Sequence, residues 1–303
     1  MGTHIASKIR LAAALALSAW GAPALADKAL NMPEGVTELS VKIYDLHMEI
    51  FWWCVGIAVV VFGVMIYSII RFRKSVGALP DKHLVHSTRV EIIWTLVPIA
   101  ILVIMAVPAA RTLIEIEDTR GSEISIKVTG YQWRWHYDYL DRGVSFFSSL
   151  SRDSNVARQL GSGIDPNTVP NYLLDVDHPL VIPAGTKVRL LLTANDVIHA
   201  WWVPDFGMKK DAIPGFVNEL WINVDEHKTG TYRGQCAELC GRDHGFMPIV
   251  VEVKSKDDFA TWLSEQEEAA KQAASPETPA DEPLAVNEPA AAPIATNTMA
   301  QTE

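Results

Sequence analysis

The chain has 303 residues, a formal net charge of −10 and only 3 cysteines. This charge disfavours nucleic acid as a partner, and so few cysteines exclude a disulfide-rich scaffold. Hydrophobic residues make up 49% of the chain and are concentrated toward the N-terminus, which indicates a membrane portion.

The first 26 residues have the pattern of a targeting segment. Lys8 and Arg10 precede the apolar stretch LAAALALSAWGAPALA, and small residues stand at Ala24 and Ala26. The apolar stretch is shorter than the roughly 20 residues that cross a bilayer as a helix. We therefore predict a cleaved signal peptide over residues 1–26. The alternative is an uncleaved third helix.

Two uncharged stretches follow in the segment 27–111. They cover Phe51–Ile70 and Ile92–Ala110, and each is long enough to span a membrane. The stretches predict helices at about 48–72 and 90–111. The loop between them holds five basic residues, Arg71, Arg73, Lys74, Lys82 and Arg89. Because basic loops stay in the cytoplasm, we expect the N-terminus and everything after residue 111 to lie outside.

The pattern changes to a period of two residues from Glu123 onward. EISIKVT alternates, and it is followed by YQWRWHYDY, PLVIP, TKVRLLL, VIHAWWV and MPIVVEV. Short β-rich runs of this kind predict an all-β sandwich or barrel over residues 112–265. Residues 141–170 are polar and are expected to form a surface loop. Residues 266–303 are acidic and rich in Ala and Pro, which is typical of a disordered tail.

Four candidate metal ligands occur within twelve residues of the β-rich region. They are Cys236, Cys240, His244 and Met247, in the spacing C-x3-C-x3-H-x2-M. Thiolate and thioether ligands favour copper or zinc among the common metals. Two thiolates can bridge two copper ions, each completed by one imidazole and one weak ligand. The pattern therefore favours a two-copper centre.

Such a centre needs a second imidazole from another part of the chain. His199 is the best candidate because it lies in the β-rich run VIHAWWV. His136, His178 and His227 are weaker candidates. The backbone carbonyl of Glu238, between the two cysteines, is a candidate for the second weak ligand.

Other interpretations of the two cysteines remain open from the residues alone. Cysteines outside the cytoplasm often form a disulfide. Zinc could also bind here, although the thioether of Met247 disfavours it. A thiol oxidoreductase or a copper chaperone could use C-x3-C, but Gly241 stands where such chaperones usually have proline.

From about residue 30 to 265 the chain resembles subunit II of bacterial cytochrome c oxidase. The resemblance rests on the predicted helix pair, on the segments QWRW, DVIHAWWVP and GMKKDAIPG, and on the cysteine cluster. It implies an α+β membrane protein in which a two-helix transmembrane hairpin precedes a cupredoxin-like Greek-key β-barrel. It implies a binuclear copper A centre with six ligands, His199, Cys236, the Glu238 carbonyl, Cys240, His244 and Met247.

The resemblance also implies roles that the residues alone do not give. The Glu238 side chain would bind a magnesium ion at the interface with subunit I. Trp133 would be the point where cytochrome c delivers its electron; the residues alone favour a half-exposed strand tryptophan. Asp177 and Asp196 would dock the basic cytochrome, and Glu91 would stand at the mouth of a proton path.

The implied function is to accept electrons from cytochrome c and pass them to haem in subunit I. Oxygen is reduced to water there, coupled to proton pumping. The implied partners are subunits I and III, cytochrome c and the bacterial inner membrane, with the β domain in the periplasm. The alternatives are a copper A domain of another respiratory reductase and a membrane copper-delivery protein.

Overall fold

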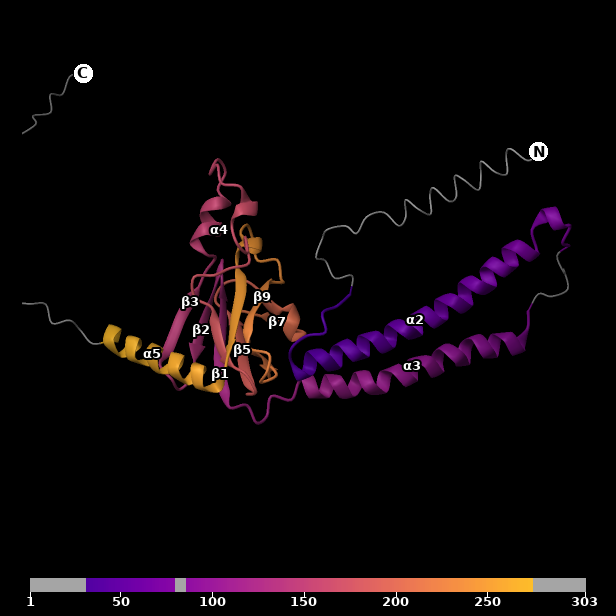
Figure 1. The fold of residues 1–303 in the computed structure, drawn as a ribbon. Coiled ribbons are helices and arrows are strands. Elements are labelled where there is room, and N and C mark those ends of the chain that lie inside the picture. Colours follow the sequence, from indigo (N-terminus) through magenta and orange to yellow (C-terminus); the bar gives the residue numbers. More distant parts are fainter. Residues whose placement is uncertain (1–30, 80–85, 275–303) are drawn as a thin grey trace, which may run out of the picture.

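A computed structural model describes residues 31–79 and 86–274. The predicted signal peptide and the last 29 residues of the predicted tail, 275–303, lie outside the described residues. The described chain consists of a helical hairpin and a β domain, which lie end to end (Figure 1).

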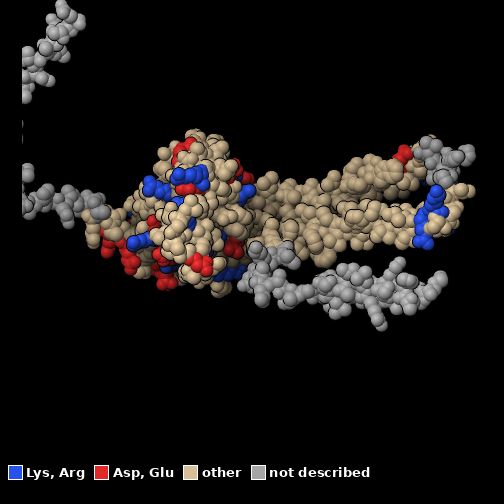
Figure 2. Space-filling view, turned by 90° about the horizontal axis from the view of Figure 1, so that it is seen from above, with Lys and Arg blue, Asp and Glu red and all other residues tan. Residues whose placement is uncertain are grey.

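The hairpin is formed by α2 (Glu38–Arg71) and α3 (Thr88–Ile116), with the short helix η1 (Lys74–Val76) after α2. Both long helices are long and apolar enough to cross a membrane. Figure 2 shows an uncharged surface along them; the basic residues Arg71, Arg73 and Lys74 lie where α2 ends and η1 begins. This arrangement fits the predicted membrane hairpin.

Helix α2 begins ten residues earlier than we expected from hydrophobicity. The Thr37 side chain accepts a hydrogen bond from the Ser40 amide at 2.9 Å, and the Ser40 hydroxyl accepts one from the Thr37 amide at 2.8 Å. This reciprocal cap satisfies amide groups that the first helical turn leaves free. The extra turns carry charged residues such as Glu38, Lys42 and Asp45, so a search for uncharged stretches alone could not predict them.

The β domain consists of two five-stranded sheets. One sheet has the order β3-β2-β1-β5-β8, and the other has the order β4-β10-β9-β6-β7. The strands are β1 (Ile124–Tyr131), β2 (Arg134–Tyr139), β3 (Val144–Ser148), β4 (Leu180–Pro183), β5 (Val188–Ala194), β6 (His199–Val203), β7 (Met208–Ala212), β8 (Asn218–Ile222), β9 (Gly230–Cys236) and β10 (Pro248–Lys254).

The two sheets share one hydrophobic core. Strand β5 shows how the sequence builds it, because Val188, Leu190 and Leu192 alternate with more exposed residues and are fully buried. Trp135 and Trp201, one from each sheet, are also fully buried. The hairpin and this curled β domain confirm the predicted fold class.

The β domain is attached to both helices of the hairpin. The Trp221 indole donates a hydrogen bond to the Glu115 carbonyl near the end of α3, at 3.1 Å. Before α2, the Val36 amide donates to the Asp205 carbonyl at 3.0 Å. These contacts fix where the domain stands on the ends of the helices.

Two parts of the domain are more ordered than the sequence indicated. The expected surface loop 141–170 contains β3 and the short helices α4 (Arg152–Ala157) and η2 (Pro166–Thr168). The segment FATWLSEQEEAAK, with Asp257 or Asp258 as a cap, favours a helix, and the observed helix α5 (Lys256–Ala274) continues past residue 265, where we expected the tail to begin. It docks through Phe259 and Leu263, which are buried against the core.

Candidate metal centre

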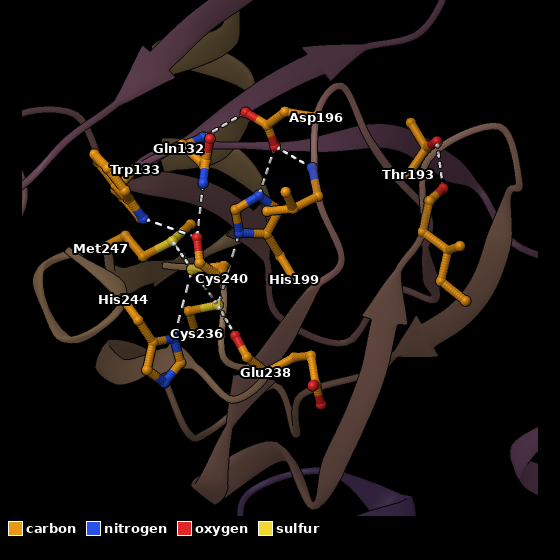
Figure 3. Close-up of polar contacts among 12 residues, drawn as sticks. Gln132, Trp133, Thr193, Asp196, His199, Cys236, Glu238, Cys240, His244 and Met247 are labelled. Carbon is orange, nitrogen blue, oxygen red and sulfur yellow. Dashed lines mark hydrogen bonds and ion pairs between the residues drawn. The ribbon is translucent and has the colours of Figure 1, made fainter. Parts of the chain in front are cut away.

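Six predicted ligands come together at one end of the β domain (Figure 3). His199 is the first residue of β6 and Cys236 is the last residue of β9, which are hydrogen-bonded neighbours. The other four lie in the β9–β10 loop, which contains the short helix η4 (His244–Phe246). Two neighbouring strands and one loop therefore supply the whole set.

The first half of the site is built around Cys236. Its sulfur lies 3.9 Å from His199 Nδ1 and 3.3 Å from the Glu238 carbonyl oxygen. The donor atoms of His199, Cys236 and Cys240 all lie within 4.8 Å of one another. One thiol, one imidazole and one carbonyl thus face a common point.

The second half is built around Cys240. Its sulfur lies 3.5 Å from His244 Nδ1 and 3.5 Å from Met247 Sδ. The two cysteine sulfurs are 3.8 Å apart and are not joined as a disulfide. The two halves therefore have matching composition, each with a thiol, an imidazole and a weak third donor, and they meet at the sulfurs.

The His199 ring is oriented by a carboxylate on its far side. His199 is 0% exposed, and its Nε2 lies 2.9 Å from Asp196 Oδ1. Asp196 also accepts hydrogen bonds from the Gln132 and Val197 amides, both at 2.7 Å. A carboxylate that holds one imidazole nitrogen directs the other toward the metal position. The family resemblance implies only a docking role for Asp196, although its place three residues before His199 is a usable signal.

The same contacts set the charges of this pair. Burial favours a neutral imidazole, but the contacts with Cys236 and Asp196 raise the pKa of His199 above its ordinary value. Burial would raise the pKa of Asp196, but the hydrogen bonds from His199, Gln132 and Val197 lower it below its ordinary value. Asp196 is therefore ionised at neutral pH and available to hold the imidazole.

Close packing leaves His199 a single position. A β-carbon added at Gly130 on β1 would lie 2.7 Å from His199 Cδ2, closer than real side chains approach. The Trp135 ring covers another side of the imidazole, with ring centres 5.9 Å apart. Gly130 is thus needed for the close approach of β1 to the ligand, a role the sequence did not indicate.

The two thiols differ in their acidity. Burial opposes ionisation of Cys236, but its hydrogen bonds with His199 and with the backbone at Ala200 and Glu238 lower its pKa. For Cys240, burial and the neighbouring Cys236 raise the pKa to about 12. A second thiolate is therefore costly here unless a cation lies between the sulfurs. Bound metal supplies that positive charge, which is the role the donor set fits.

Trp133 contacts the ligand loop directly. It is half-buried at the turn between β1 and β2, and its indole Nε1 donates a hydrogen bond to the Cys240 carbonyl at 3.1 Å. The side chain of Gln132 donates to the same carbonyl at 3.0 Å. Gly241 lets the loop come this close, because an added β-carbon would lie 3.2 Å from Trp133 Cζ2.

The other histidine candidates are not in the site. The His136 ring contacts Phe147, with ring centres 4.7 Å apart, while His178 lies beside Asp177 and His227 beside Glu226. Each of these contacts involves no ligand of the cluster.

The remaining predicted residues lie outside the cluster. Asp177 is exposed and accepts a hydrogen bond from the Ser149 amide at 2.7 Å. Glu91 lies in the first turn of α3, and its amide donates to the Ser87 carbonyl at 3.0 Å. Helix α3 begins at the end of the hairpin away from the β domain (Figure 1). The Glu238 side chain is exposed beside the cluster.

Comparison with known proteins gives a consistent result. The family model for cytochrome c oxidase subunit II, periplasmic domain, matches residues 124–254, and the model for its transmembrane domain matches residues 26–111. The chain is 45% identical over 226 residues to a probable cytochrome c oxidase subunit 2 of Rickettsia prowazekii, covering 74% of this chain and 67% of that one.

A second relative and a solved structure carry the same name. The probable subunit 2 of Rickettsia bellii is 42% identical over 230 residues, with 76% of this chain and 81% of that protein covered. The periplasmic domain of subunit II from Bradyrhizobium japonicum is 39% identical, with 50% of this chain and 98% of that chain covered and a TM-score of 0.42. On the matching family models and the Rickettsia relatives, the chain belongs to the cytochrome c oxidase subunit II family.

Proposed function

We propose that this chain accepts single electrons from cytochrome c at a binuclear copper centre and passes them to haem in oxidase subunit I. The observation that carries the proposal is the meeting of two thiols, two imidazoles, a thioether and a carbonyl. Soft sulfur donors together with imidazoles suit copper. The ligands would be His199, Cys236, the Glu238 carbonyl, Cys240, His244 and Met247.

When bound, the copper pair would take up and release one electron at a time. The chain would prepare the site for this chemistry by holding the ligands still and excluding water. Cys236, Cys240 and Met247 are buried, and His199 is fixed by Asp196 and by close packing against Gly130. Ligands that cannot move on reduction keep the reorganisation of the site small.

Trp133 would be the place where the electron reaches the chain. Its half-buried ring extends from the domain surface to the Cys240 carbonyl, so it connects solvent with the backbone of a ligand residue. The neighbouring Arg242 guanidinium lies 5.7 Å from the Trp133 ring centre. Arg242 would lie on the same docking surface as the carboxylates of Asp177 and Asp196. These two carboxylates would attract a basic cytochrome, and the attraction would weaken with salt.

Family membership supports three further roles within this proposal. The Glu238 side chain would bind magnesium at the interface with subunit I, where a carboxylate oxygen is a suitable ligand. Glu91 would lie at the mouth of a proton path that leads into the same partner. The hairpin would cross the bacterial inner membrane beside subunits I and III, with the N-terminus and the β domain in the periplasm.

The test is a stopped-flow measurement on the whole oxidase mixed with reduced cytochrome c. In Trp133→Phe, copper reduction should slow several-fold, while copper content and the copper absorption bands stay unchanged. Trp262→Phe is the matched control, because Trp262 is a half-buried tryptophan that packs on Tyr139 from α5. An unchanged rate of copper reduction in Trp133→Phe would show that Trp133 is not on the electron route. An oxidase that holds no copper in this chain would overturn the proposed function itself.

A further inference from the structure

The segment between β3 and β4, residues 149–179, forms an ordered insertion at the copper end of the domain. Its two ends pair with each other: the Ser151 amide donates to the Asp175 carbonyl at 2.9 Å, and the Asp177 amide donates to the Ser149 carbonyl at 3.0 Å. Helix α4 stands on this base (Figure 1). The insertion can therefore hold a side chain in a fixed position.

Arg158, directly after α4, extends from the insertion to the ligand loop. Its Nη2 lies 3.6 Å from Asp243 Oδ2, and its guanidinium carbon lies 4.3 Å from the Phe246 ring centre. Its Nε donates a hydrogen bond to Asn155 Oδ1 at 2.8 Å, which orients the guanidinium group. The side chains of Arg158 and Asp243 are only 22% and 15% exposed.

The two contacts of Arg158 lie on either side of a metal ligand. Asp243 precedes His244 and Phe246 follows it by two residues, and the Phe246 amide donates to the Asp243 carbonyl at 2.9 Å to close the turn. Arg158 thus holds both ends of the short turn that carries His244. Among residues 31–79 and 86–274, no carboxylate forms a hydrogen bond or ion pair with the His244 ring, in contrast to the His199 ring.

A second arginine joins the insertion to the other half of the site. Arg233 of β9 lies with its Nη2 3.4 Å from Asp175 Oδ1 at the base of the insertion. Strand β9 ends in Cys236. The insertion therefore contacts both the strand that leads into the ligand cluster and the turn within it.

We propose that Arg158 is a positioning residue of the copper centre, which fixes the orientation of His244 through Asp243 and Phe246. The inference rests on the proposed copper function and adds to it a role for the insertion. A planar guanidinium suits this role because it can pair with a carboxylate and stack on an aromatic ring together. A lysine lacks this planar group and is a compact point charge, so it is less suited to making both contacts at once.

The test uses the full chain purified with copper. Substitution of groups that orient metal ligands weakens metal binding about 10- to 100-fold, so Arg158→Gln should release copper to a chelator roughly tenfold faster. Its electron paramagnetic resonance hyperfine splitting should also change, because His244 can turn. Arg158→Lys should lie between these results and wild type. Arg152→Gln replaces an exposed arginine at the start of α4; it is the matched control and should equal wild type.

A second variant separates positioning from folding. Phe246→Leu removes the stacking partner and keeps Arg158 and Asp243, so it should shift the splitting in the same direction by a smaller amount. The inference would be overturned if Arg158→Gln kept the copper release rate and the hyperfine splitting of wild type. If Arg158→Gln does not fold, the same result in a folded Phe246→Leu would overturn it. A wild-type chain without a two-copper signal would instead overturn the proposed function.

Discussion

The two histidines of the site are held in different ways. His199 begins β6, which has a neighbouring strand on each side, is fully buried, and has Asp196 on its far nitrogen. His244 lies on a three-residue helix, is half-buried, and depends on neighbours that Arg158 contacts. The half around Cys236 (the sheet half) thus has its thiol and its imidazole on strands, and the half around Cys240 (the loop half) lies wholly in a loop.

The comparison shows how a fixed metal site can be assembled from a scaffold and a loop. Strands give more precise positions than loops, and loops open locally at a lower free energy. The sheet half should therefore exist before metal binds. The loop half should become fixed through the metal and through the contacts of the insertion.

The largest expected difference concerns the two histidines themselves. His199→Ala should abolish copper binding and also lower the thermal unfolding midpoint of the metal-free chain. The substitution opens a cavity and leaves Asp196 without its hydrogen-bond partner, and the lost partner alone costs about 1–3 kcal/mol. His244→Ala should abolish copper binding but leave that midpoint almost unchanged. Copper analysis and thermal circular dichroism measure both; equal falls in midpoint would contradict the comparison.

Two glycines beside the histidines allow a sharper test of the difference between the two halves of the site. Gly130→Ala should displace the His199 ring, since the new β-carbon would lie 2.7 Å from Cδ2, and copper content should fall strongly. Gly245→Ala, directly after His244, should retain copper because a β-carbon there meets no atom within 4 Å. Copper content per chain after dialysis distinguishes the two. Full copper retention by Gly130→Ala would show that the sheet half tolerates movement.

Substitutions of the two carboxylates predicted to dock cytochrome c, Asp177 and Asp196, should have different effects. Asp196→Asn should weaken copper binding about 10- to 100-fold and shift the copper spectrum, because Asp196 orients His199. Asp177→Asn should leave the spectrum unchanged and only lower the rate of reaction with cytochrome c at low salt. Chelator competition and salt-dependent kinetics measure these effects. A copper spectrum shifted equally by both substitutions would argue against the positioning role of Asp196.

The smallest expected effect concerns the ion pair between Asp175 and Arg233 at the base of the insertion. Asp175→Asn weakens the pairing with Arg233 but leaves Arg158, Asp243 and Phe246 in place. Because a half-exposed ion pair contributes at most about 1 kcal/mol, the copper signal should be unchanged and the release rate should rise less than in Arg158→Gln. A larger effect of Asp175→Asn would place the main support of the loop at Arg233.

The candidate ligands could be selected from the sequence, whereas their surroundings could not. Spacing and donor chemistry were enough to select Cys236, Cys240, His244 and Met247 as candidate ligands, because all four lie in one segment, and the structure brings their side chains together. The roles of Gly130, Asp196 and Arg158 depend on which strands and loops become neighbours, and a local pattern does not contain that information. The charged first turns of α2 and the short helices within 141–170 were missed for a related reason, since capping and tertiary contacts stabilise them rather than an uncharged stretch or a periodic pattern.

The two-copper centre itself is tested most directly by electron paramagnetic resonance of the purified full chain loaded with copper. If the proposed centre is correct, we expect a seven-line hyperfine pattern in a purple protein, because one unpaired electron would be shared equally by two copper nuclei. A four-line pattern from a single copper would contradict the binuclear centre.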